Sequence, residues 1–192
     1  MGMGDHIARA AALMPGDEAY PLVPTEFVDV HCHCLPNLDD GPTSMDEAIV
    51  LCRSLVTDHV STVVATPHQL GWFEHRTRGE VIRRTTHQLN QELRERGIDL
   101  EVLPGAEVRA DERIDGLLTR REILTLADAG KYVLLELPWD VLLDIEPLLI
   151  QLSLRGVQAI LAHPERNIPL LQHRPTLQRW LACGVGLQIT AA

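Results

Sequence analysis

Short groups of histidines and carboxylates recur along this 192-residue chain in a regular relation to apolar runs. In chain order they are His31-Cys-His33, Asp39-Asp40-Gly41, Thr66-Pro67-His68, Gly105-Ala106-Glu107 and His163-Pro164-Glu165-Arg166. Each histidine or glutamate group lies at or just past the C-terminal end of a strand-like run, so the groups should converge at one end of a sheet. Imidazoles and carboxylates are the ligands of hydrolytic metal centres. The pattern therefore predicts a metal site that activates water.

The pair His31 and His33 is the first candidate for metal ligation. Residues two apart on a strand project to the same face, so both imidazoles can approach one ion. A thiolate site on Cys32 and Cys34 is the alternative, on the opposite face. Asp40 follows closely in a turn and becomes a further expected ligand, whereas its neighbour Asp39 should orient the loop.

Three more ligands are expected at the ends of later strands. His68 follows a strand through the rigid Pro67, and His163 ends another. Glu107 ends an apolar strand where a bare carboxylate would be costly to bury, which makes it the natural bridging ligand. Arg166, in the loop after His163, is placed to hold an anionic group through forked hydrogen bonds. A surface ion pair with Glu165 is the alternative for this arginine.

Several other chemistries are excluded or disfavoured. No cysteine has an arginine six positions later, as a cysteine phosphatase needs, and no GxSxG elbow occurs. The formal net charge is -10, which argues against general attraction to nucleic acid. Arginines are frequent in residues 76–96 but are interrupted by acids and polar residues, as on a solvated helix face. Metal-activated water remains the favoured nucleophile.

The elements that must position these residues alternate between strands and helices. Strands are expected at residues 27–31, 61–66, 100–108, 132–137, 157–162 and 185–190. Helices are expected at 44–56 after a capping box, at 80–96, 144–155 and 175–183, and in pieces at 112–126 with a break near Gly116. Alternating strands and helices predict an α/β fold with a parallel sheet. Polar residues at strand ends favour a closed barrel over an open doubly wound sheet.

The four cysteines form no CxxC motif, and Cys52 and Cys183 are expected to be buried on helices. This usage fits a reducing, cytoplasmic compartment. No run of about 20 apolar residues is present, so no membrane insertion is expected. Residues 1–24 are expected to be a disordered extension, and residues 25–192 to form one domain that carries the metal site.

Taken together, the motifs resemble the polymerase-and-histidinol-phosphatase (PHP) superfamily over residues 27–190. The motifs are Asp29-Val-His31-Cys-His33, Asp39-Asp-Gly-Pro42, Ala65-Thr-Pro-His68, Pro104-Gly-Ala-Glu-Val-Arg109, Ala162-His-Pro-Glu-Arg166 and Leu187-Gln-Ile-Thr190. Within this superfamily, the motifs resemble the manganese-dependent tyrosine phosphatases of bacterial capsule and exopolysaccharide operons. The resemblance implies a distorted, seven-stranded TIM-like PHP barrel with three metals. It also implies dephosphorylation of a tyrosine-phosphorylated polysaccharide-synthesis kinase. By motif match the metal roles fall to His31, His33, Asp40, His68, Glu107 and His163, and phosphate binding to Arg166.

Two departures from the family pattern bear on these expectations. Gln69 stands where the family often has a second histidine. The family also ends its barrel with a strand that carries an Asp-x-His pair, which this sequence lacks. Residues 25–192 are therefore expected to be a PHP-type metallophosphatase domain that is incomplete at its C-terminus, with the last strand and helix missing. Two metal ligands should then be absent, and the first and last strands should be exposed edges that favour self-association into a homo-oligomer.

The sequence leaves the function open between three readings. Hydrolysis of phosphotyrosine in proteins leads, with Mn²⁺ as the expected metal and Fe or Zn as alternatives. A small-molecule phosphoesterase of the histidinol-phosphate type is the second reading. A catalytically impaired fragment that acts as a binding module is the third.

Overall fold

The structure, a computed structural model, describes residues 26–190, so the expected N-terminal extension lies outside the described residues. The fold is α/β with parallel strands, as expected. The strands are β1 (Phe27–Cys32), β2 (Val60–Ala65), β3 (His68–Gln69), β4 (Glu101–Pro104), β5 (Glu107–Arg109), β6 (Tyr132–Glu136), β7 (Gln158–Ala162) and β8 (Gly186–Gln188). The α-helices are α2 (Met45–Thr57), α3 (Gly79–Glu95), α4 (Ile114–Thr119), α5 (Glu146–Leu154), α6 (Ile168–Gln172) and α7 (Arg174–Ala182). Short 3-10 turns are η1 (Gly71–Phe73), η2 (Leu126–Asp128) and η3 (Pro164–Arg166).

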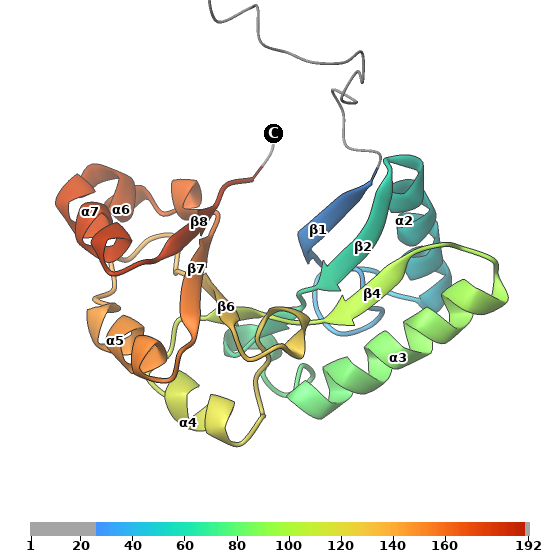
Figure 1. Ribbon diagram of the computed structural model, residues 1–192, viewed down its shortest axis with the longest axis horizontal. Coiled ribbons are helices and arrows are strands. Elements are labelled where there is room, and N and C mark those ends of the chain that lie inside the picture. Colours follow the sequence, from blue (N-terminus) through green and yellow to red (C-terminus); the bar gives the residue numbers. More distant parts are fainter. Residues whose placement is uncertain (1–25, 191–192) are drawn as a thin grey trace, which may run out of the picture.

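The described strands form two parallel sheets, of order β1-β2-β4 and β3-β5-β6-β7-β8. Figure 1 shows the first sheet flanked by α2 and α3, and the second flanked by α5, α6 and α7. Among the described residues, β1 and β8 each pair with a single strand, which places both at sheet edges.

The single strand expected at residues 100–108 is wrong, because the chain changes sheets within it. β4 pairs with β2 in the first sheet, while β5 pairs with β3 and β6 in the second. Gly105 lies at this crossing, where a Cβ would come within 2.7 Å of the Val64 side chain. Only a residue without a side chain allows so close an approach.

The helices largely follow their sequence signals. Ser44 caps α2 by accepting a hydrogen bond from the Glu47 amide at 3.2 Å. The Glu47 carboxylate accepts from the Thr43 amide at 2.7 Å, one residue before the expected partner. The break expected near Gly116 is wrong, because α4 runs through this residue.

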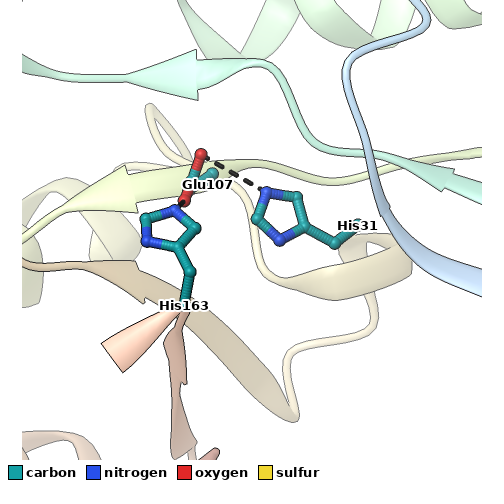
Figure 2. A group of neighbouring side chains, drawn as sticks. All are labelled: His31, Glu107 and His163. Carbon is teal, nitrogen blue, oxygen red and sulfur yellow. Dashed lines mark hydrogen bonds and ion pairs between the residues drawn. The ribbon is translucent and has the colours of Figure 1, made fainter. Parts of the chain in front are cut away.

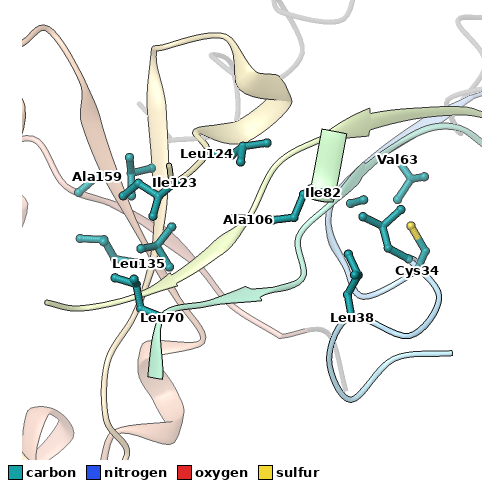
Figure 3. Packing of buried hydrophobic residues seen from close by; sticks show 14 of the residues in the cluster. Cys34, Leu38, Val63, Leu70, Ile82, Ala106, Ile123, Leu124, Leu135 and Ala159 are labelled. Atoms are coloured by element: carbon teal, nitrogen blue, oxygen red, sulfur yellow. The ribbon is translucent and has the colours of Figure 1, made fainter. Parts of the chain in front are cut away.

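Apolar side chains from both sheets form one buried cluster, which fixes the strands relative to each other (Figure 3). Ile82 on α3 and Leu135 on β6 are both fully buried in it. Cys52 is buried as expected, but Cys183 is exposed because it caps the end of α7 instead of packing inward. Within residues 26–190, no helix is both long and apolar enough to cross a membrane.

Candidate metal centre

The predicted ligand residues lie at the ends of β1 and β7, at the starts of β3 and β5, and in the loop after β1. His31 lies in β1 and His33 one residue beyond it, while His163 directly follows β7. His68 and Glu107 open β3 and β5 and are paired in register across these two strands. His68 and Glu107 therefore lie just past the carboxyl ends of β2 and β4, which are parallel, and the side chains meet at one edge.

Glu107 lies at the middle of the cluster and is fully buried. Its Oε1 lies 2.6 Å from His163 Nε2. Its Oε2 lies 3.4 Å from His31 Nε2, 3.3 Å from His33 Nε2 and 3.1 Å from His68 Nδ1. Figure 2 shows the carboxylate between the rings of His31 and His163. Four imidazoles from three separate segments therefore surround one carboxylate.

The Oε2 atom of Glu107 is the best indicator of what this cluster can hold. It is buried and has no hydrogen-bond partner among the described residues, although three imidazole nitrogens lie near it. A buried carboxylate oxygen without a donor is costly unless a cation compensates it. Oxygen and nitrogen donor atoms that converge in this way suit a divalent metal.

Asp39 holds the ring of His33, in keeping with its expected orienting role. Its Oδ2 lies 2.6 Å from His33 Nδ1 and also accepts from the His68 amide at 2.9 Å, while Oδ1 accepts from the Gly41 amide at 3.1 Å. Gly41 is tightly placed, because a Cβ there would overlap the backbone carbonyl oxygen of His33. A carboxylate behind a ligand imidazole fixes its orientation and raises its basicity.

Asp40 approaches the cluster from the solvent side. Its side chain is 65% exposed, and Oδ1 lies 3.4 Å from His33 Nδ1 and 3.8 Å from His68 Nε2. These three residues form one group with donor atoms close enough to share an ion. A second group is His31, Glu107 and His163. All six residues predicted from the sequence thus lie in one of two adjoining groups.

Glu136 belongs to the site but was not predicted. It ends β6, and its Oε2 lies 3.6 Å from His68 Nδ1, so that His68, Glu107 and Glu136 form a third group. Arg109 Nη1 lies 3.8 Å from the same oxygen. The available signal was the one that identified Glu107, namely an acid at the end of an apolar strand. None of the three groups contains a cysteine, so the geometry does not support the thiolate alternative.

Electrostatics couple the carboxylates and imidazoles strongly. Burial opposes the charge on Glu107, but the imidazoles of His163, His31 and His33 outweigh it and hold the pKa of this carboxyl well below its usual range. Burial likewise opposes the charge on His33, yet Asp39 and Glu107 raise its pKa to about 10. The carboxylates therefore favour positive charge at the centre, which protons or metal ions can supply.

Backbone strain helps to aim His163 at Glu107. His163 has φ 33° and ψ 53°, in the left-handed region that residues other than glycine rarely occupy. The turn directs Nε2 to the carboxylate 2.6 Å away. Strain of this kind persists where surrounding contacts impose it, and it is concentrated at functional sites.

A cavity of about 950 Å³ opens over the cluster. Arg166 lines it, and within the described part of the chain this arginine makes no ion pair, since its Nη2 contacts only Thr190 Oγ1 at 3.4 Å. The expected alternative, an ion pair with Glu165, does not form. The Glu165 carboxylate instead accepts from the Thr190 amide at 3.0 Å.

Gln69 plays a structural role. It is buried, its amide nitrogen donates to the carbonyls of Thr77 and Glu122 at 2.5 and 3.2 Å, and its oxygen accepts from the Leu124 amide at 2.8 Å. It is not among the residues that line the cavity. It therefore joins the segment after β3 to the loop after α4 and offers no donor to the centre.

A parallel α/β fold with imidazoles and carboxylates gathered near its strand ends is suited to metal-assisted hydrolysis. The family model for capsular polysaccharide synthesis, CpsB/CapC, matches residues 27–192, and the chain belongs to this family.

Relatives of the chain include named tyrosine phosphatases. It is 35% identical over 166 residues to tyrosine-protein phosphatase YwqE of Bacillus subtilis, a match that covers 86% of this chain and 65% of that protein. It is 30% identical over 169 residues to tyrosine-protein phosphatase CpsB of Streptococcus pneumoniae, covering 86% and 68%. The chain thus spans just under two thirds of the length of YwqE.

The fold also matches a solved structure. A crystallographic study of YwqE from B. subtilis and CpsB from S. pneumoniae, described there as metal-dependent tyrosine phosphatases, contains a chain that aligns with a TM-score of 0.80 at 34% identity. The alignment covers 85% of this chain and 66% of that one.

Proposed function

We propose that this chain is a metal-dependent phosphomonoester hydrolase that acts on phosphotyrosine in proteins. The observation that carries the proposal is the unpartnered, buried Glu107 Oε2 with three imidazole nitrogens 3.1 to 3.4 Å away. The names of its relatives support the choice of substrate. The same relatives support a PHP-type barrel as the complete architecture and a function in capsular or exopolysaccharide synthesis.

The metal ligands in this proposal are the six sequence-predicted residues together with Glu136. They are His31, His33, Asp40, His68, Glu107, Glu136 and His163. The mixture of imidazole and carboxylate donors suits Mn²⁺, and it also accommodates Fe or Zn. When bound, such ions supply Lewis acidity toward phosphoryl oxygens and lower the pKa of a coordinated water. Glu107, a member of two of the three groups, is the proposed bridging ligand.

The chain's own residues then have separate tasks. Arg166, free of ion pairs within the described residues, lines the cavity and binds the phosphoryl oxygens through its guanidinium. Asp39 fixes the ring of His33 through Nδ1, which leaves Nε2 directed at Glu107. Burial of the Glu107 carboxylate keeps this side of the centre dry, where electrostatic interactions are strongest.

The proposed partner is a tyrosine-phosphorylated polysaccharide-synthesis kinase, or another phosphotyrosine protein. The four free cysteines fit a cytoplasmic location. The single-neighbour strands β1 and β8 offer edges for self-association into a homo-oligomer. No role in nucleic-acid binding is proposed for a chain of net charge -10.

The experiment compares Mn²⁺-dependent phosphate release from a phosphotyrosine peptide and from histidinol phosphate. The variants are His163→Gln and the matched control His87→Gln, whose imidazole is exposed on α3. We expect peptide hydrolysis by the wild-type chain and the control, and none by His163→Gln. Hydrolysis that does not respond to Mn²⁺, or that survives in His163→Gln, contradicts the proposal. Faster turnover of histidinol phosphate would assign the site to small substrates instead.

A further inference from the structure

One of the three tryptophans is exposed in the wall of the metal-centre cavity. Trp139 lies in the loop after β6, lines this cavity and is 70% exposed. Trp180 is fully buried in the core. Trp72, in η1, is 87% exposed but is not among the residues that line the cavity. Exposure of a large indole costs free energy that burial would recover, and at a cavity wall a ligand can provide that burial.

The backbone around Trp139 is held in place from the segment that follows Arg166. Asn167 is buried, and its amide nitrogen donates to the carbonyls of Pro138 and Val141, the second at 3.1 Å. The carbonyl of Trp139 accepts from the Ile168 amide at 3.3 Å. Three hydrogen bonds thus fix the loop on both sides of the tryptophan. The indole is therefore presented by an anchored backbone adjacent to the phosphate-binding arginine.

The lining of the cavity has two chemically different parts. One comprises the imidazoles and carboxylates of the metal centre, together with Arg166. Its apolar lining comes from Leu137, Ala162 and Trp139. A ligand that fits both parts carries a dianionic phosphate at one end and a flat apolar group at the other. Aryl phosphates have this character, whereas the phosphate esters of small alcohols lack the flat group.

We propose that Trp139 is a specificity-determining residue whose indole packs against the aromatic ring of an aryl phosphate bound at the metal centre. The proposal rests on the phosphomonoesterase function proposed above and assigns the preference for an aromatic ester to one side chain. Aromatic rings prefer offset-stacked or edge-to-face contacts, which a pair of this kind can adopt at a cavity wall.

The test measures binding of two non-hydrolysable probes, phenylphosphonate and methylphosphonate, to the Mn²⁺-loaded chain by calorimetry. The wild-type chain should bind phenylphosphonate more tightly. Trp139→Ala should reduce this preference by about twofold to tenfold, the range expected for one aromatic pair, with methylphosphonate affinity unchanged. Trp139→Phe should retain most of the preference, and the control Trp72→Ala should retain all of it. Because Trp139 is exposed, none of these variants should lower the melting temperature appreciably.

Two results separate this inference from the proposed function. Equal wild-type affinity for both phosphonates, or an unchanged preference in Trp139→Ala, overturns the role of Trp139 and leaves the metal-dependent hydrolase intact. Failure of the Mn²⁺-loaded chain to bind either phosphonate contradicts the proposed function, and the inference fails with it. In parallel, Trp139→Ala should raise KM for a phosphotyrosine peptide without changing KM for the phosphoserine peptide of the same sequence.

Discussion

The proton on His33 gives the metal-free chain a pH dependence that can be calculated from the structure. Its ring lies 2.6 Å from Asp39 and 3.3 Å from Glu107, and its side chain is 24% exposed. Burial opposes the charged imidazole, but the two carboxylates prevail and raise its pKa to about 10. In the unfolded chain the imidazole should have the ordinary histidine pKa of about 6.5.

The folded state therefore binds this proton more tightly than the unfolded state does. The stabilisation is fully present below pH 6.5 and is lost as the pH rises toward 10. For one proton the free energy of unfolding should fall by up to about 1.4 kcal/mol per pH unit, and by at most about 5 kcal/mol in total. That total is a large part of the 5 to 15 kcal/mol typical of a domain, on the order of half of it.

The assay is urea unfolding of the chain in chelator, at steps of pH between 6 and 9.5. The wild-type chain and His87→Gln should lose stability along this range, whereas His33→Gln should show a much smaller slope. Added Mn²⁺ should oppose the trend, because deprotonated imidazoles bind metal more strongly as the pH rises. A flat profile for the wild-type chain, or an equal slope in His33→Gln, would refute the charge coupling described for this cluster.

Other substitutions give separate expectations. Glu107→Gln should weaken Mn²⁺ binding at the two groups that contain Glu107, and Asp40→Asn at the one group that contains Asp40. Calorimetry would measure the number of ions bound per chain. An equal loss of bound ions in the two variants would argue against a bridging role for Glu107. Gly41→Ala should lower both the melting temperature and the metal affinity, since a Cβ overlaps a backbone carbonyl there, while the helical control Gly116→Ala should not. Trp180→Ala should lower the free energy of unfolding by about 3 to 5 kcal/mol in the same urea assay, because the indole is fully buried. A decrease of less than about 1 kcal/mol would contradict the place of Trp180 in the core.

Much of the cluster could be predicted because the proposed ligands follow a simple rule. Parallel strands collect their carboxyl ends at one edge, so a histidine or acid after each apolar run must lie near the others. This rule was sufficient to bring His31, His68, Glu107 and His163 together. The same rule applies to Glu136, at the end of β6. Because no histidine or glycine stands beside Glu136 in the sequence, the sequence did not distinguish this acid from a solvent-exposed one.

The sequence was less informative where long-range packing sets the backbone. The division of residues 100–108 between two sheets depends on the close approach of Gly105 to β2, which no local propensity encodes. The left-handed turn at His163 is likewise imposed by surrounding contacts, against the preference of the residue. Trp139 carried no signal at all, because an exposed tryptophan in a loop becomes informative only once the cavity beside it is known.

The central claim is that Glu107 and its surrounding imidazoles hold divalent metal. Anomalous X-ray diffraction from crystals of the Mn²⁺-loaded chain tests it most directly, because it locates the ions independently of catalysis. We predict one manganese peak among His31, Glu107 and His163, and a second among His33, Asp40 and His68. Absence of manganese beside Glu107 in crystals with bound Mn²⁺ elsewhere would contradict the account.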